Sequence, residues 1–239
     1  FSRFTLKVLF RILIWKNISN TLPMKIQSIF IFLLVSLIFF GCKPDKLEIE
    51  IYTSDIDSAS EGEIIEVPMK ATFRLMGEDK ENQLPKAKEI ALKYMPSDSE
   101  IEISKGSFGQ VMTVVSSIPL GNESSLELFL QQNPRIGMVI VQDGVVTLKP
   151  TETLSKLDKE LKSINFMLGA KIPAKNTSFR IVSDSKKKVN ISATAIFSEK
   201  KPYLTYSKDI KRRKSIVIDF KGGEGSVYSE IAPIFNVKL

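Results

Sequence analysis

The 239-residue chain contains no histidine and only one cysteine, Cys42. Without an imidazole, Ser–His–Asp and Cys–His catalysis is excluded, and so is any zinc site that uses histidine. A single cysteine also leaves no partner for an intramolecular disulfide. The groups that remain for catalysis are carboxylates, lysine, tyrosine and serine, and stability has to come from an ordinary hydrophobic core.

Acidic residues are missing from the first 41 positions, which carry five lysines and arginines. Within this stretch, Met24-Lys25 is followed by an apolar run of about a dozen residues, Ile29 to Phe40, and then by Gly41 and Cys42. A run of this length is typical of a secretory signal, whose apolar region spans roughly 7–15 residues, and is shorter than the ~20 residues that cross a bilayer. We therefore expect residues 24–41 to be a signal peptide.

The residues around Cys42 resemble the lipobox of bacterial lipoproteins, in which signal peptidase cuts before a cysteine that carries a thioether-linked diacylglycerol. Phe39 departs from the usual leucine three positions before the cysteine. The resemblance implies cleavage between Gly41 and Cys42, fatty acids such as palmitate on Cys42, and a lipid-anchored protein of the cell envelope. By analogy with known sorting, Lys43 favours the outer membrane. An uncleaved anchor helix is the alternative.

Residues 1–23 precede this complete signal and begin with Phe rather than Met. We interpret them as translated sequence upstream of the true start at Met24, or alternatively as a long leading segment of the signal. Because five positive charges lie in residues 1–41, the formal charge of +7 falls to +2 from Cys42 onward. The high isoelectric point therefore gives no support to nucleic-acid binding.

From Cys42 onward the hydrophobic pattern predicts mostly β-strands. Apolar and polar residues alternate from Ile65 to Leu75, where Pro68 indicates an edge strand or a bulge. Met138 to Leu148 is expected to be a hairpin that turns at Asp143-Gly144. Further alternation marks residues 47–51, 189–197 and 215–220.

Two helices are expected between these strands. One follows Pro85 and stops before Pro96, and the other runs from Thr151 to Leu168 with a leucine stripe and ends at Gly169. Together the elements predict an α+β protein, mainly antiparallel β with two helices and a β-sandwich-like C-terminal part.

The expected organisation has three parts after the signal. Residues 42–63 would hold the lipid anchor, the first strand and a linker, residues 64–173 an α+β domain, and residues 174–239 the sandwich-like part. Charge also divides the chain, because residues 43–150 carry 11 basic and 18 acidic groups and residues 151–239 carry 18 and 9. This polarity suits two halves that pack together, or a molecule with one acidic and one basic face.

The segment KGSFGQV, Lys105 to Val111, matches part of the glycine-rich loop of protein kinases, G-x-G-x-x-G-x-V. Ser104 stands at the first glycine position, the next strand offers no lysine for the phosphates, and the catalytic loop would need a histidine. We interpret the segment as a glycine turn that leads into a strand.

Three pairs of glutamates with i,i+2 spacing would place two carboxylates on one face of a strand. Such pairs can serve a glycosidase or hold Ca²⁺. The pairs are Glu48 with Glu50, Glu61 with Glu63, and Glu100 with Glu102. Because they alternate with apolar residues or lie in a loop, we interpret them as solvated surface, and we predict no catalytic, cofactor or metal site.

Basic residues gather in three clusters in the C-terminal part. The clusters are Lys186, Lys187 and Lys188; Lys200 and Lys201; and Lys211, Arg212, Arg213 and Lys214. If the first and last lie at neighbouring strand ends, they form an anion-binding patch for anionic lipid, lipopolysaccharide or an acidic envelope protein. The alternative is that they are solvated turns whose lysines protect the strand ends.

Four segments resemble a loosely defined family of small lipoproteins found in bacteria and their prophages. They are FFGCKPDK, LPKAKEIALKYMPSD, INFMLGAKIP and KKPYLTY. The resemblance implies a location and no activity, so we expect a non-enzymatic binding or structural module, anchored through Cys42 and facing the periplasm. The alternatives are a prophage lipoprotein that blocks superinfection by binding an envelope receptor, and a carboxylate-based hydrolase.

Overall fold

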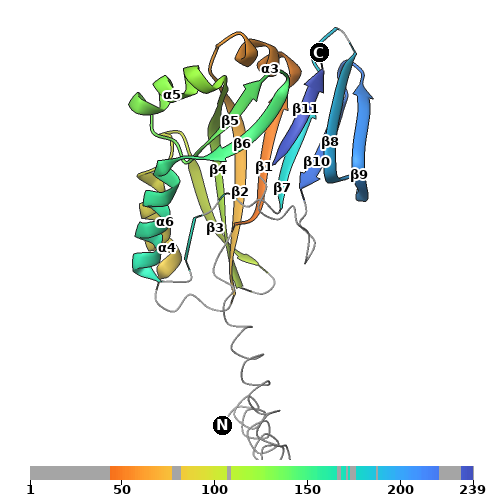
Figure 1. Ribbon diagram of the computed structural model, residues 1–239. Helices are drawn as coiled ribbons and strands as arrows, with labels where there is room; N and C mark the ends of the chain where they lie inside the picture. Colours follow the sequence, from red (N-terminus) through yellow and green to blue (C-terminus); the bar gives the residue numbers. More distant parts are fainter. Residues whose placement is uncertain are drawn as a thin grey trace, which may run out of the picture. The chain divides into compact units, whose positions relative to one another are not determined.

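The computed structural model describes residues 44–76, 82–106, 109–165, 168–170, 172, 176–186, 188–220 and 233–238 (Figure 1). Residues from Gly41 to Leu239 form one compact unit. The described residues form eleven strands and four helices. No helix among them is both long and apolar enough to cross a membrane.

Strands dominate the chain, and nine of them close into a barrel. The strands are β1 (Pro44–Tyr52), β2 (Ile65–Met76), β3 (Glu100–Gly106), β4 (Gly109–Gly121), β5 (Gly137–Gln142), β6 (Val145–Pro150), β7 (Thr177–Val182), β8 (Val189–Ser198), β9 (Lys201–Ile210), β10 (Ser215–Phe220) and β11 (Ile234–Lys238). Around the barrel they follow the order β10-β7-β1-β2-β4-β5-β6-β11-β8, and the pair Phe197 and Asp219 joins β8 back to β10. β3 and β9 lie outside the ring, paired with β4 and β8.

The prediction of an α+β protein that is mainly antiparallel β is confirmed, but the sandwich-like C-terminal part is wrong. β1 inserts between β2 and β7 and runs parallel to β7, while β11 pairs with β6. The C-terminal strands therefore satisfy their backbone hydrogen bonds with strands from earlier in the chain. One barrel results, because no second sheet is left for them to pack against.

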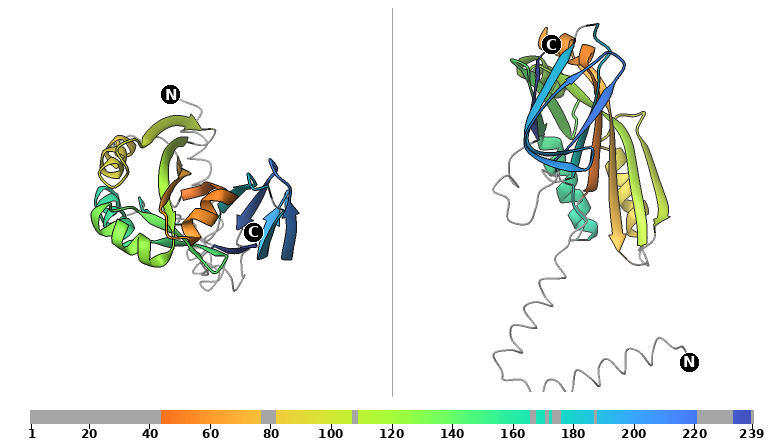
Figure 2. Two further views of the ribbon diagram at one scale, coloured as in Figure 1. Left: turned by 90° about the horizontal axis from the view of Figure 1, so that it is seen from above. Right: turned by 90° about the vertical axis from the view of Figure 1, so that its right-hand side faces the viewer.

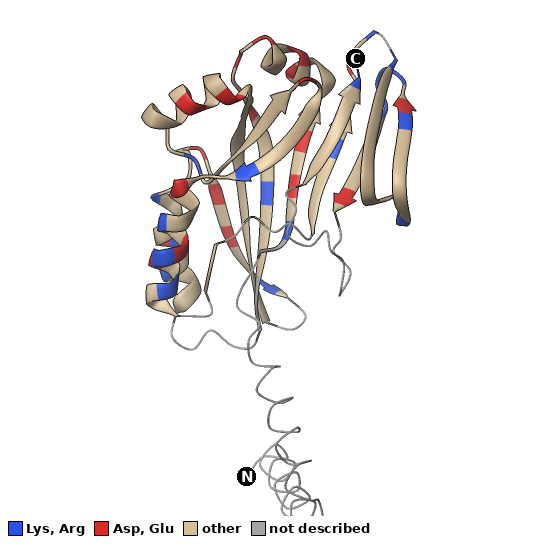
Figure 3. Ribbon diagram, viewed as in Figure 1, with Lys and Arg blue, Asp and Glu red and all other residues tan. Residues whose placement is uncertain are grey.

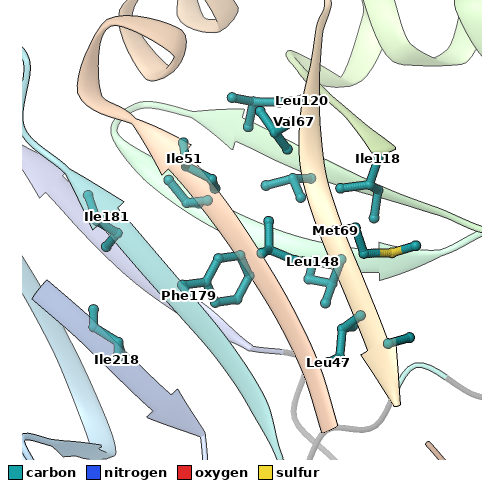
Figure 4. Close-up of a cluster of buried hydrophobic side chains, with 14 of the residues drawn as sticks. Leu47, Ile51, Val67, Met69, Ile118, Leu120, Leu148, Phe179, Ile181 and Ile218 are labelled. Carbon is teal, nitrogen blue, oxygen red and sulfur yellow. The ribbon is translucent and has the colours of Figure 1, made fainter. Parts of the chain in front are cut away.

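The barrel interior is filled by alternate residues of its strands, as the period of two requires. Side chains from β1, β2, β4, β6, β7 and β10 point into one space in Figure 4. Phe179 on β7 is fully buried and makes edge-to-face contacts with the rings of Phe235 at 5.1 Å and Phe220 at 6.1 Å. These aromatic contacts join β7, β10 and β11, so they help to hold the barrel closed.

Helix α3 (Thr53–Ser60) follows β1 within residues 42–63, where the sequence analysis expected a linker. Thr53, Ile56 and Ala59 lie on one face and are fully buried, and the helix contacts β1, β2, β4 and β5. The sequence of α3 is polar, which is typical of a loop. Its three buried side chains recur at every third residue, however, and this spacing places them on one face of a helix. α3 therefore plugs one end of the barrel.

Two further helices correspond to those predicted. α4 (Gln83–Leu92) begins two residues before Pro85, and α6 (Glu152–Ile164) ends earlier than the expected Leu168 because Asn165 is already extended. Their apolar faces bury Leu84, Ala87, Leu157 and Leu161. Both helices lie on the opposite side of the molecule from β8 and β9 (Figure 2).

Helix α5 (Glu123–Gln132) was not predicted. Asn122 caps it, since its side-chain oxygen accepts a hydrogen bond from the Ser125 N–H at 2.9 Å. Leu126 is the single fully buried residue of this helix. One buried leucine gives no periodic stripe, so the hydrophobic pattern could not reveal it.

The expected turn at Asp143-Gly144 is confirmed, with positive φ at both residues. Pro68, in contrast, does not lie on an edge strand, because β2 runs between β1 and β4. The register of β1 with β2 ends at Ile49 opposite Met69, the residue next to Pro68, and does not include the proline. The missing N–H of Pro68 therefore interrupts no continuing ladder toward β1.

The barrel has two distinct ends, which the strand registers define. β1 starts at Pro44 and rises to Tyr52, which lies beside Val182 at the end of β7. Val182 pairs with Ser215, the first residue of β10, while Ile210 at the end of β9 pairs with Val189. Tyr52 and these strand ends mark the upper end in Figure 1, and Pro44 marks the lower end.

Candidate functional site: the basic rim of the barrel

Three of the predicted site residues lie outside the described residues. They are Gly41 and Cys42, the expected cleavage and lipidation positions, and Lys187 of the expected anion-binding patch. The lipid anchor therefore stays a prediction, whereas the rest of the patch can be located.

Six exposed cations gather at the upper end of the barrel, on two neighbouring connections. We call them the basic rim: Lys186, Lys188, Lys211, Arg212, Arg213 and Lys214. The first two lie between β7 and β8, and the other four form the turn between β9 and β10. The sequence analysis predicted a patch if these two clusters lay at neighbouring strand ends. They do, because the end of β7 pairs with the start of β10.

Backbone hydrogen bonds fix the two connections to each other. The Ser183 N–H donates to the Lys214 carbonyl at 2.9 Å, and the Arg213 N–H donates to the Ser183 carbonyl at 2.6 Å. Arg213 adopts a left-handed conformation with φ of 61°, which closes the turn. The cations therefore project from one rigid part of the fold rather than from two independent loops.

Two carboxylates lie among these cations. The Lys188 ammonium is 2.5 Å from Asp209, which also accepts a hydrogen bond from the Asn190 side chain at 2.8 Å. Lys188, together with Asn190, holds the pKa of Asp209 below its ordinary value. With Asp184 as the second carboxylate, the six cations leave the basic rim a net charge of +4.

Asp184 connects the basic rim to helix α3. Its carboxylate accepts hydrogen bonds from the Thr53 hydroxyl at 2.8 Å, the Ser54 N–H at 3.0 Å and the Ser54 hydroxyl at 2.5 Å. A carboxylate at the start of a helix satisfies free N–H groups and the helix dipole. Asp184 thus acts as a cap supplied from a distant part of the chain.

Hydrogen bonding decides the ionisation of this carboxylate. Burial alone would raise the pKa of Asp184, but the bonds from Ser54 and Thr53 outweigh it and lower the pKa. The pKa of Asp55 on the same helix is raised, chiefly by burial and further by the nearby Asp184 charge. Because the folded state prefers ionised Asp184, this carboxylate contributes stability above the unfolded pKa of about 3.9 and loses it as the pH falls further.

Asp184→Ala should lower the free energy of unfolding at pH 7 by about 1 kcal/mol, the usual cost of losing a helix cap, since solvent exposure weakens the charged part. The loss should be smaller at pH 3, which lies below the unfolded pKa of about 3.9, because the unfolded chain then binds the proton and offsets the preference of the folded state for ionised Asp184. Urea unfolding at both pH values measures it. Asp57→Ala, which removes an exposed carboxylate from the same helix, is the matched control. An equal loss in both variants, or a loss independent of pH, would contradict the capping role.

Acidic and basic groups occupy different parts of the upper end. The ribbon colouring in Figure 3 marks acidic residues on α3 and basic residues at the turns beside β8, β9 and β10. At this end, acidic residues from the first half of the chain thus lie apart from basic residues of the second half (Figure 3). Lys238, which sequence reasoning missed, also lies here, opposite Asn190 in the register of β11 and β8.

The remaining basic cluster does not join the basic rim. Lys200 and Lys201 lie at the turn between β8 and β9, at the far end of both strands. Glu199 in the same turn forms an ion pair with Lys208 at 2.7 Å. Only two of the three clusters are thus brought together.

The glutamate pairs lie on the surface. Lys46 is 2.5 Å from Glu48, and Glu50 contacts Arg180 at 3.3 Å. Glu100 and Glu102 are exposed on β3. Within the described part of the chain, no group of three Asp, Glu or Cys residues could hold a metal ion.

The described residues of the kinase-like segment belong to two paired strands, which agrees with its interpretation as a glycine turn that leads into a strand. β3 ends at Gly106 and β4 begins at Gly109, and these two glycines pair with each other. Val111 lies opposite Ser104 in the ladder, so the segment continues directly into β4.

Two hollows lie elsewhere. A cavity of about 30 Å³ between α4, α6 and the sheet is lined by apolar groups such as Phe73, Met112 and Leu161, and it has room for little more than one water molecule. A shallow hollow of about 300 Å³ on β8 and β9 lies beside Tyr203 and Tyr206. Its Glu199 and Lys208 already neutralise each other.

Comparison of the chain with family models, with curated proteins and with solved structures finds no match. A functional proposal therefore rests on the arrangement of residues described above.

Proposed function

We propose that this protein is a non-enzymatic, lipid-anchored envelope protein that binds an anionic lipid surface through the basic rim. The observation that carries the proposal is the convergence of the β7–β8 and β9–β10 connections, held together by hydrogen bonds at Ser183. Residues about twenty-five positions apart in sequence thereby present their charges on one surface.

The basic rim suits a broad charged surface better than a small ligand. Its cations are exposed, and neither hollow described above lies there. Clusters of four to eight lysines and arginines attract anionic bilayers, with about 1 kcal/mol for each cation near the surface. A net charge of +4 on two rigid turns fits this kind of recognition.

The anchor would raise the local concentration of the protein at a membrane. Cys42 in its lipobox-like context supports lipidation, and several acyl chains hold a protein on a bilayer stably whereas one does so only marginally. Non-enzymatic action fits the surface positions of the glutamate pairs, since Glu48 and Glu50 are already bound in ion pairs.

Binding should be seen with the fragment 43–239, because every described core residue lies within it. It should sediment with vesicles of phosphatidylglycerol and phosphatidylcholine, and not with phosphatidylcholine alone. Raising salt from 0.1 M to 1 M shortens the Debye length from about 10 Å to about 3 Å, so the bound fraction should fall at least tenfold.

Circular dichroism before sedimentation checks that the fragment is folded. Equal binding to both vesicle types would contradict the proposal, and so would binding to anionic vesicles that persists at 1 M salt. In either case the basic rim would consist of ordinary solvated turns.

A further inference from the structure

The basic rim and the start of β1 lie at opposite ends of the barrel. Pro44, the first residue of β1, is two positions after Cys42, and two residues span at most about 7 Å. Tyr52, at the other end of β1, lies beside Val182 next to the basic rim. The eight steps from Pro44 to Tyr52 extend roughly 26 Å.

This separation weakens any attraction between the basic rim and the bilayer that holds Cys42. Roughly 26 Å is about three Debye lengths at physiological salt, where the Debye length is about 8 Å. Charges on the anchoring bilayer are therefore largely screened at the basic rim when the barrel stands upright.

A barrel lying on the side formed by β1, β7 and β10 would not solve this problem. Exposed and half-exposed positions of β1, β7 and β10 would then meet the bilayer: Lys46, Glu48, Glu50, Arg180 and Asp219. These groups carry a net charge of −1, and four of them are already bound in the pairs of Lys46 with Glu48 and Arg180 with Glu50. Anionic headgroups would not hold the protein in this orientation.

We propose that the basic rim binds the anionic headgroups of a second bilayer, facing the one that holds Cys42, so that the protein bridges two lipid surfaces. The inference rests on the proposed function and adds which of two bilayers the basic rim binds. A bilayer is the favoured partner because the described cations are spread over two exposed turns. A dissolved polyanion is the competing occupant.

The test uses the full lipidated protein, reconstituted into immobilised vesicles of phosphatidylcholine. Fluorescent vesicles containing phosphatidylglycerol are then added, and their capture at 0.1 M salt is measured. Capture should exceed that of neutral fluorescent vesicles at least tenfold. It should also persist when the protein's own vesicles contain phosphatidylglycerol, because the basic rim faces away from them.

Each other outcome overturns a stated part of the account. If the fragment 43–239 binds anionic vesicles but the anchored protein captures none, the second-bilayer inference is wrong while the proposed function stands. Capture that disappears when the anchoring vesicles become anionic shows that the basic rim turns toward its own bilayer. Retention of dissolved polyphosphate without capture of vesicles identifies a soluble polyanion as the partner. If neither the fragment nor the anchored protein binds, the proposed function fails as well.

Discussion

Cys42→Ser should abolish the incorporation of fatty acid into this protein completely. The chain has no other cysteine, so no second thiol can accept the diacylglycerol. Growth of cells with an alkyne-bearing palmitate, followed by click labelling of the purified protein, measures the incorporation directly. The wild type should be labelled and the serine variant should not.

Intact-mass analysis of the wild type completes this test. The expected mass corresponds to a chain that begins at a lipidated Cys42, without residues 1–41. Gly41→Ala keeps a small residue before the cysteine and should remain labelled, which controls for a general effect of changes at the cleavage site. Label on Cys42→Ser, or an unmodified Cys42 with Gly41 still attached, would show that the lipobox resemblance is misleading.

Strand periodicity made much of the fold predictable, because alternation depends only on neighbouring residues. β2, β8 and the hairpin at Asp143-Gly144 follow directly from local pattern and turn chemistry. The barrel does not, because its closure depends on β1 pairing in parallel with β7. The residues of a strand show which of its faces is buried, but they do not show which distant strand pairs with it.

The missed helices have the same kind of cause. α3 starts at Thr53 because Asp184 caps it, and these residues are 131 positions apart. Asn122 followed by Glu123 was a visible local signal for α5, yet Leu126 alone could not confirm it.

Part of the candidate site could also be predicted from the sequence. The lysine and arginine runs are visible in the sequence, but their meeting at neighbouring strand ends depends on the pairing of β7 with β10, which local pattern does not give. Ser183, which ties the two connections together, has no sequence signature. Lys238 joins this end only through the pairing of β11 with β8, which lies beyond local pattern.

Reversing three charges of the basic rim should remove binding to anionic bilayers. Lys211, Arg212 and Lys214 are exposed, so glutamate at these positions leaves the core untouched. Arg213 is left unchanged because its positive φ closes the turn. At about 1 kcal/mol for each cation near an anionic surface, loss of three cations alone weakens binding roughly a hundredfold.

A matched variant separates the position of the charges from their number. Lys105→Glu, Lys159→Glu and Lys201→Glu make the same change in net charge at exposed positions away from the basic rim. Lys159 lies on α6 three positions from Lys156 and from Lys162, so glutamate there gains opposite charges on its helix face. Both triple variants should unfold at urea concentrations close to that of the wild type.

The ratio of the dissociation constants of these two triple variants for phosphatidylglycerol-containing vesicles, at 0.1 M salt, tests the central claim most directly. If the basic rim is the binding surface, the variant of Lys211, Arg212 and Lys214 should bind roughly a hundredfold more weakly than the matched variant. The matched variant should stay within a few-fold of the wild type. Equal weakening of both would show that only net charge matters, and would contradict a binding surface at this end of the barrel.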